Sequence, residues 1–219
     1  LGSEAGKGGT TSAPYSSGQN NTALGYQALT AFTTGDNNTA IGYLALNDNT
    51  SAGNNVAIGA DASHKGTTAN KNVAVGNLAS YFNETGIYNV SIGYEAMKGA
   101  SGNSHSNNVA VGYLALTSVT TGGSNVAIGT NAGNSLTSGG SNIMIGNGVA
   151  TTLSTGGSNV IIGTIAGTAV SEGGKNILIG REAGKDISSG DSNVAIGYQA
   201  LYSENTGTYQ VSIGYRSGY

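Results

Sequence analysis

The stretch "GGSNVAIGTNAG", residues Gly122–Gly133, decides the fold of this chain. Variants such as "GDNNTAIGYLAL" (35–46) and "GGSNVIIGTIAG" (156–167) recur along the sequence with a period of 17, interrupted by a single interval of 19. The glycine that closes each "N-V-A-I-G" serves as the marker of a copy. The marker glycines are Gly25, Gly42, Gly59, Gly76, Gly93, Gly112, Gly129, Gly146, Gly163, Gly180, Gly197 and Gly214. Such a period predicts that residues 20–219 form a single repeat array.

The N-terminal residues depart from this period. "LGSEAG" at the start matches "IGREAG" at 179–184, and a Ser/Gly-rich stretch with Pro14 follows it. We therefore expect residues 1–19 to be a partial coil with an irregular excursion. The chain begins without Met and ends inside a repeat, so we expect a fragment or a processed product.

Each copy of the repeat has the pattern of a short strand between turns. In "N-V-A-I-G" the β-branched residues are two apart and share one face, whereas Asn and Ala share the other. Gly and Ser/Thr clusters flank the run and would break a helix. One unit cannot bury its Val/Ile side chains alone, but stacked units can. The prediction is an all-β fold, a parallel β-solenoid or β-roll of about twelve 17-residue coils, with Val126 and Ile128 in the core.

Composition excludes several classes of protein. Charged residues make up 9% of the chain, against about 25% in ordinary domains, and the net charge is −3. This charge gives no electrostatic footprint for nucleic acid, and no apolar run is long enough for membrane insertion. The chain has no Cys, so thiolate metal sites are excluded. No cofactor or metal is expected, and the scattered acids do not suit a repeat-based calcium site.

Stacking converts each recurrent position into a ladder along the array. The residue four before the marker is Asn in eleven of twelve copies, which predicts a ladder of amides bonded between coils or capping the turns. The marker glycine is expected to adopt positive φ or a tight turn that no side chain would tolerate. Adjacent hydroxyl pairs such as Thr120–Thr121 precede a glycine and are interpreted as local turn residues, which argues against an ice-binding face.

Two coil types occur within the array, and one group of residues points to contacts between chains. Where Tyr follows the marker, the residue four after it is Leu or Met in most copies; where Thr or Arg follows, that residue is Gly. In three consecutive coils the small residue two before the marker is replaced by a bulky one. These residues are Met144, Ile161 and Leu178. Because bulky apolar side chains on the non-core face should not be left in water, they are candidate interchain contacts.

Nothing in the sequence indicates an enzyme. His64 and His105 lie in loop segments without an acidic or Cys partner at metal spacing, so both are interpreted as solvated loop residues. Recognition is more plausible in loops that depart from the repeat. "YFNETGIYNVSIGY" (81–94) and "YSENTGTYQVSIGY" (202–215) are near-copies that each put two tyrosines beside Glu and Asn. The candidate glycan contacts are Tyr81, Tyr88, Glu84, Tyr202, Tyr209 and Glu204; the alternative, which we favour, is that the paired tyrosines brace the loop by packing on each other.

The motifs "NNTALGYQAL" and "NNTAIGYLAL" resemble the N-T-A-[IV]-G-Y-x-A-L repeats of bacteriophage tail fibres, and "SNVAIG" is similar to the head repeats of trimeric autotransporter adhesins. The resemblance covers residues 20–219. It implies a homotrimeric rod outside the cell, in a virion tail fibre, that attaches to a host-surface polysaccharide or protein receptor. The alternatives are an adhesin head on a bacterial cell surface and, third, a polysaccharide depolymerase.

Overall fold

The computed structural model describes residues 2–8, 17–203 and 206–218 and contains short parallel strands joined by turns and loops. The chain divides into two compact units, Leu1–Asn108 and Val109–Tyr219. The strands of the first unit are β1 (Thr22–Leu24), β2 (Thr39–Ile41), β3 (Val56–Ile58), β4 (Val73–Val75) and β5 (Val90–Ile92). Those of the second are β6 (Val109–Val111), β7 (Val126–Ile128), β8 (Ile143–Ile145), β9 (Val160–Ile162), β10 (Ile177–Ile179), β11 (Val194–Ile196) and β12 (Val211–Ile213).

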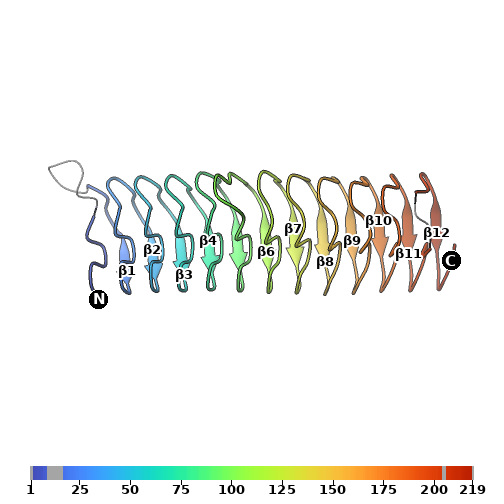
Figure 1. The fold of residues 1–219 in the computed structure, drawn as a ribbon, viewed down its shortest axis with the longest axis horizontal. Helices are drawn as coiled ribbons and strands as arrows, with labels where there is room; N and C mark the ends of the chain where they lie inside the picture. Colours follow the sequence, from blue (N-terminus) through green and yellow to red (C-terminus); the bar gives the residue numbers. More distant parts are fainter. Residues whose placement is uncertain (1, 9–16, 204–205, 219) are drawn as a thin grey trace. The chain divides into compact units, whose positions relative to one another are not determined.

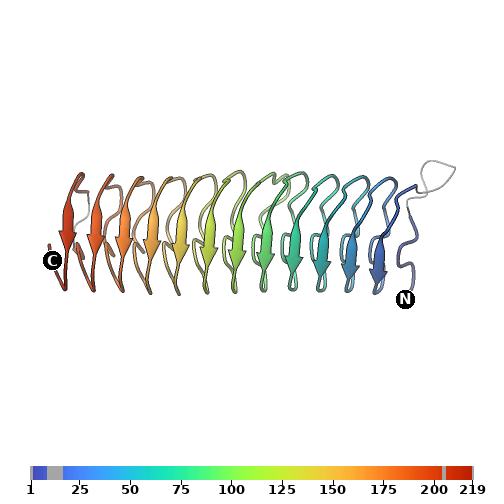
Figure 2. The same ribbon diagram turned by 180° about the vertical axis from the view of Figure 1, so that it is seen from behind.

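Within each unit the strands pair in sequence order, parallel and in register. Ala40 lies beside Ala57 in one unit, and Met144 lies beside Ile161 in the other. Opposite views show that each strand is followed by a return segment leading to the next strand of its unit (Figures 1 and 2). The expected parallel β-solenoid of 17-residue coils is therefore confirmed for both units, and each repeat contributes one strand of three residues.

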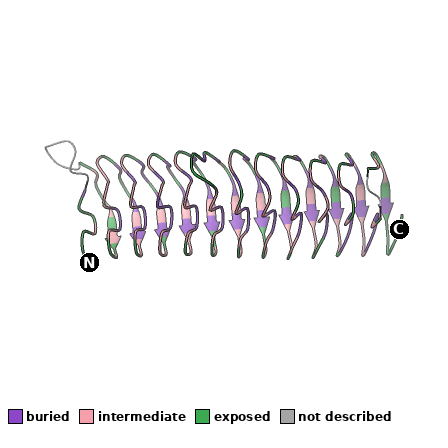
Figure 3. Cartoon of the chain, in the orientation of Figure 1, coloured by how far each residue is buried: buried purple, intermediate pink, exposed green. Residues whose placement is uncertain are grey.

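The inward face of the strands is the opposite of the one expected. Ala127, the central residue of β7, is fully buried, whereas Ile128 is 38% exposed and Val126 is half-buried. Figure 3 shows the same contrast between buried and more exposed positions in most strands. The return segment packs its own alanines, such as Ala132, against the strand, and most coils have a small side chain at the inward strand position. Small side chains allow this close approach, and the Val/Ile side chains face outward.

The marker glycines adopt the positive φ expected from the sequence. Their φ values lie between 125° and 147°. A Cβ on Gly129 would collide with the carbonyl oxygen of Gly146 in the next coil, and the same holds for Gly25 against Gly42. Any side chain at this position would therefore force neighbouring coils apart.

The predicted amide ladder is present and buried. Asn142 Oδ1 accepts hydrogen bonds from the backbone N–H of Asn159 at 3.0 Å and from its Nδ2 at 3.1 Å. Asn142 Nδ2 donates to the carbonyl oxygen of Gly156 at 2.9 Å. Each Asn thus bonds both to the next amide and to the backbone of the next loop, which satisfies polar groups that would otherwise be buried without partners.

The hydroxyl side chains before the loop glycines bond to the neighbouring coil, whereas the sequence predicted that they would bond within their own turns. Thr120 Oγ1 donates to the carbonyl oxygen of Thr137 at 3.0 Å, and Thr137 Oγ1 donates to that of Ser154 at 3.1 Å. The partners in each pair are one repeat period apart, so the hydroxyls connect neighbouring coils.

The bulky residues assigned to interchain contacts lie inside the coil. Met144, Ile161 and Leu178 are fully buried in the single chain, so they cannot meet another copy. They fill space left by small residues in the return segment: a Cβ on Gly133 would lie 2.6 Å from Met144 Sδ, and one on Gly167 would lie 3.0 Å from Leu178 Cδ1. In the other coil type, Leu116 fills the same region and the strand position is Ala127. The two coil types are therefore two ways of filling one core volume.

Candidate functional site

The first candidate surface is the outward face of the strands, which we call the Val/Ile face. In each unit it consists of the first and last residues of that unit's strands, and the residue after the marker glycine adds tyrosines at its edge. Ile58 is 37% exposed, Ile177 is 38% exposed and Tyr43 is 52% exposed. The rings of Tyr26 and Tyr43 stack with their centroids 5.5 Å apart. A row of apolar side chains on one sheet face is typical of an interaction surface.

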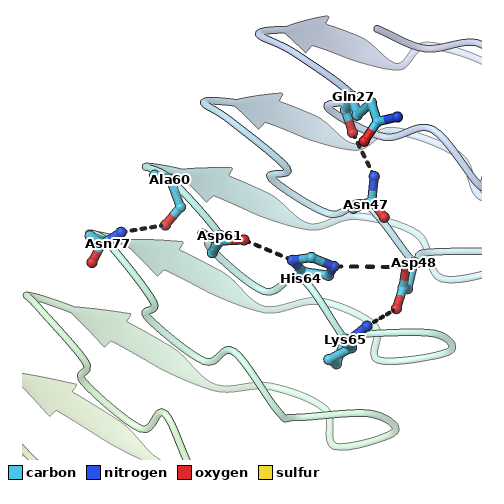
Figure 4. Close-up of polar contacts among 8 residues, drawn as sticks. All are labelled: Gln27, Asn47, Asp48, Ala60, Asp61, His64, Lys65 and Asn77. Carbon is cyan, nitrogen blue, oxygen red and sulfur yellow. Dashed lines mark hydrogen bonds and ion pairs between the residues drawn. The ribbon is translucent and has the colours of Figure 1, made fainter. Parts of the chain in front are cut away.

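The second candidate is a polar group in unit 1, the His64 cluster, made of Asp48, Asp61, His64, Lys65 and Tyr81. The turn after β3 brings His64 Nδ1 to 2.8 Å from Asp61 Oδ1 (Figure 4). On the other side of the ring, Nε2 lies 3.9 Å from Asp48 Oδ1 of the preceding coil. Because an ionised carboxylate can only accept, Nδ1 carries a proton in the contact with Asp61.

The neighbouring ion pair ties two coils together within this cluster. Lys65 Nζ donates to Asp48 Oδ2 at 2.7 Å, and this hydrogen bond raises the pKa of the Lys65 ammonium group above its usual value. Asn47 and Asn77 make similar bonds between coils, to the carbonyl oxygens of Gln27 and Ala60 (Figure 4). The cluster is therefore held by neighbouring coils rather than by a flexible loop.

The interpretation of His64 as a solvated residue is wrong. Its residue exposure is 9%, and an acidic partner lies three residues before it. Alignment by the period would have revealed its other neighbours, since Tyr81 follows His64 by one repeat period and Asp48 precedes Lys65 by one. The ring centroids of His64 and Tyr81 are 5.1 Å apart.

The paired tyrosines do not brace each other in the first of the two near-copies. Tyr81 lies against His64 and, edge to face at 4.5 Å, against Phe82. Tyr88 is instead covered by Lys71, whose Nζ lies 4.9 Å from the ring centroid and donates to the tyrosine hydroxyl at 2.8 Å. The structure therefore places Tyr81 within the His64 cluster, whereas Tyr88 makes a separate contact with Lys71.

The remaining candidate glycan residues are also dispersed. Glu84 Oε1 accepts a hydrogen bond from the backbone N–H of Gly102 at 2.8 Å, which holds the 19-residue coil. Tyr202 accepts a hydrogen bond from Lys185 Nζ at 2.8 Å, and Tyr209 is 82% exposed. Glu204 lies outside the described residues.

His105 is the second histidine whose predicted environment is wrong. Its side chain is fully buried and neither ring nitrogen has a hydrogen-bond partner. Burial lowers the pKa of His105 to about 4, because the charged ring would lose its hydration. His105 lies seven residues before its marker glycine, at the loop position that Gly86 and Gly122 hold in neighbouring repeats.

Comparisons of the chain with protein-family models, with curated proteins and with solved structures find no match. No group of three or more His, Cys, Asp or Glu side chains in the described ranges is arranged to hold a metal ion. Nor does the described part of the chain contain a helix long and apolar enough to cross a membrane. The surfaces present are an apolar sheet face and an aromatic, carboxylate-rich cluster, both suited to binding.

Proposed function

We propose that this chain is a structural and host-attachment segment of a bacteriophage tail fibre, working outside the cell as a homotrimer. The observation that carries the proposal is the Val/Ile face. Its side chains stay more than a third exposed in the single chain at positions such as Ile58, Ile92 and Ile128. Burying apolar surface stabilises an assembly by about 25 cal/mol per Å², so a repeated apolar ladder favours association along its length.

Association of identical chains suits this face because all copies present the same ladder. Because these apolar side chains are short and evenly spaced, two or more chains can pack against one another through their Val/Ile faces. A closed, symmetric assembly of chains buries the Val/Ile face of every copy. The number three comes from the resemblance to trimeric fibre and adhesin repeats. The buried residues Met144, Ile161 and Leu178 play no part in this interface.

The oligomer is tested by placing a charge on the Val/Ile face. Ile58→Lys and Ile128→Lys should convert the protein from three chains of 21.6 kDa each to single chains, since a buried unpaired ammonium is costly. Multi-angle light scattering measures the mass. Ser51→Lys and Thr121→Lys, which are exposed positions of the same repeats, are the matched controls and should remain trimeric. A wild-type protein that is monomeric at micromolar concentration contradicts the proposal.

For attachment, we propose that the His64 cluster contacts a host-surface glycan, with Tyr81 as its stacking ring. An aromatic ring beside carboxylate and ammonium groups can stack on a sugar and bond its hydroxyls. On a glycan array, Tyr81→Ala should reduce binding at least about tenfold, while Tyr81→Phe should retain it because the ring face remains. Light scattering of both variants must show an unchanged oligomer. Equal binding by wild type and Tyr81→Ala would remove Tyr81 from the site.

A further inference from the structure

One turn of unit 2 contains an asparagine followed directly by glycine. Asn147 and Gly148 lie in the turn after β8, and every other asparagine of the chain is followed by a residue with a side chain. The carboxamide of an asparagine can be attacked by the backbone nitrogen of the next residue. A glycine obstructs this attack least, because it has no Cβ and leaves the backbone free to rotate. The pair therefore has the composition of a deamidation site.

The glycine at this position is not required by the fold. The residue two after the marker glycine has positive φ in every described copy, for example 54° at Leu44 and 58° at Leu78. Gly148 has the same conformation, with φ of 61°, and is the one glycine among these residues. A Cβ on Gly148 would meet no atom of a non-adjacent described residue within 4 Å. The coil thus accepts a side chain here, and glycine adds only the freedom to leave the turn conformation.

The side chain of Asn147 is available for reaction. It is exposed, and its amide makes no hydrogen bond within the described ranges. Asn77 occupies the equivalent position of another repeat, where its Nδ2 donates to the carbonyl oxygen of Ala60 at 3.1 Å and the next residue is Leu78. Asn77 is therefore a natural control for Asn147.

The backbone around Asn147 holds the reaction back while the coil is closed. The N–H of Gly148 donates to the carbonyl oxygen of Thr130 in the preceding coil at 2.9 Å. The carbonyl oxygen of Asn147 accepts from the N–H of Ile165 in the following coil at 3.0 Å. While the first of these bonds is intact, solvent cannot take the proton of the attacking nitrogen. Reaction therefore requires local opening of the coil.

We propose that Asn147 is a site of spontaneous deamidation whose rate is set by the opening of its coil. In the open coil, hydroxide takes the amide proton of Gly148, and the nitrogen forms a bond to Asn147 Cγ. The bond from Cγ to Nδ2 breaks, and Nδ2 takes a proton from water and leaves as ammonia. Water then opens the resulting cyclic succinimide at either carbonyl, which gives aspartate or isoaspartate. No oxidant or reductant is needed.

Isoaspartate would disturb the contacts with both neighbouring coils. Its main chain runs through Cβ and Cγ and is longer by one carbon, and the former carbonyl group becomes a free carboxylate. The bonds to Thr130 and Ile165 then no longer fit together, so the modified chain should unfold at a lower denaturant concentration than the unmodified chain. The proposal is independent of the oligomer and of the glycan contact.

The test follows the loss of amide groups during incubation at mildly alkaline pH. The purified chain is kept folded or in guanidinium chloride above its unfolding transition. Mass spectrometry of proteolytic fragments then measures deamidation at each asparagine, and electron-transfer fragmentation separates aspartate from isoaspartate. In the unfolded chain Asn147 should react at least about tenfold faster than Asn77, because glycine follows it. In the folded chain Asn147 should react at least about tenfold more slowly than in the unfolded chain.

Two variants separate the chemistry from its control by the coil. Gly148→Leu supplies the residue that Leu44 and Leu78 provide at this position, so it should keep the circular dichroism spectrum and slow deamidation of the unfolded chain at least about tenfold. Met144→Ala weakens the packing of β8, so it should speed deamidation at Asn147 in the folded chain and leave the unfolded rate unchanged. Equal rates at Asn147 and Asn77 in the unfolded chain, equal rates at Asn147 in the folded and unfolded chain, or no effect of Met144→Ala would overturn the proposal.

Discussion

At the scale of single residues, the fold depends on matching volumes across neighbouring coils. Leu116 and Ala127 fill the core in one way, and Gly133 and Met144 fill it in another. Both leucine and glycine at this return position have positive φ, 50° for Leu116 and 57° for Gly133, so leucine carries backbone strain that glycine avoids. The size of the side chain at the return position therefore determines the size of the side chain that fits at the centre of the next strand.

A double-mutant cycle measures this coupling. Met144→Ala alone should lower the free energy of unfolding by about 3 kcal/mol, because it leaves a cavity over Gly133. Gly133→Leu alone should also destabilise the protein, since its side chain would collide with Met144. The double variant recreates the Leu116–Ala127 arrangement and should recover most of the loss in urea unfolding. Strictly additive losses would contradict volume matching.

His105 should make stability depend on pH. Its pKa is about 4 in the folded chain and 6.5 as a free side chain, so below pH 6.5 the unfolded chain binds a proton that the folded chain does not. The free energy of unfolding should fall as pH decreases from 6.5 toward 4, by about 3 kcal/mol in all, and be fully restored above pH 6.5. Urea unfolding of wild type and His105→Leu across this range isolates the effect, with exposed Asn107→Ala as control. Parallel pH profiles for wild type and His105→Leu would show that His105 is not the source.

At the scale of elements, a strand of three residues is stabilised mainly by its neighbours. Each strand shares its backbone bonds with the coils before and after it, and the buried asparagine adds three more bonds between coils. This explains why the asparagine recurs in eleven of twelve copies and the glycine in all twelve: both stabilise the contact between one coil and the next.

Asn142→Ala should therefore cost far more than an exposed substitution nearby. It leaves the N–H of Asn159 and the carbonyl oxygen of Gly156 without their partner and removes one of the two hydrogen bonds that Asn159 Nδ2 donates, so we expect a loss of about 3 kcal/mol. Thermal unfolding followed by circular dichroism measures the loss. Ser141→Ala, at the exposed neighbouring position, should be close to neutral. Similar losses for both variants would mean that the ladder contributes little.

Much of each element could be predicted from the sequence, because the period fixes the positions of strands, turns and ladders. Alternation in "N-V-A-I-G" separated the two faces correctly but could not show which face the return segment covers. Ala127 is inside because the return segment packs directly on it, and this depends on the width of the coil. The surroundings of His64 were also missed, although aligning the sequence by its repeat period places Tyr81 beside it.

At the scale of the whole molecule, the two units differ in the composition of their cores. At the loop position seven residues after the marker, unit 2 has fully buried Leu136 and Leu153, whereas unit 1 has buried Asn49 and Asn83. The side-chain amide of Asn49 and the hydroxyl of Ser80 are buried without partners. The first unit therefore gains less from burial of apolar side chains.

We expect unit 1 to open first. Amide hydrogen exchange at Val56–Ile58 should be at least about tenfold faster than at Val160–Ile162, since protection follows local apolar burial. Asn49→Val should slow exchange in β2 and β3 and leave β9 unchanged. Faster amide exchange at Val160–Ile162 than at Val56–Ile58 would contradict the conclusion that the core of unit 1 is the less stable one.

The contact between marker glycines also has a consequence for how such a gene can change in length. Because the carbonyl of one marker glycine fits against the next, a small loss or gain inside a strand would break the alignment. Recombination between repeats instead adds or removes complete copies of the unit, and every ladder returns to register. In the sequence, the two extra residues of the 19-residue interval lie between β5 and β6 and outside both strands. Length can thus evolve in whole repeats, with new binding residues arising in the loops.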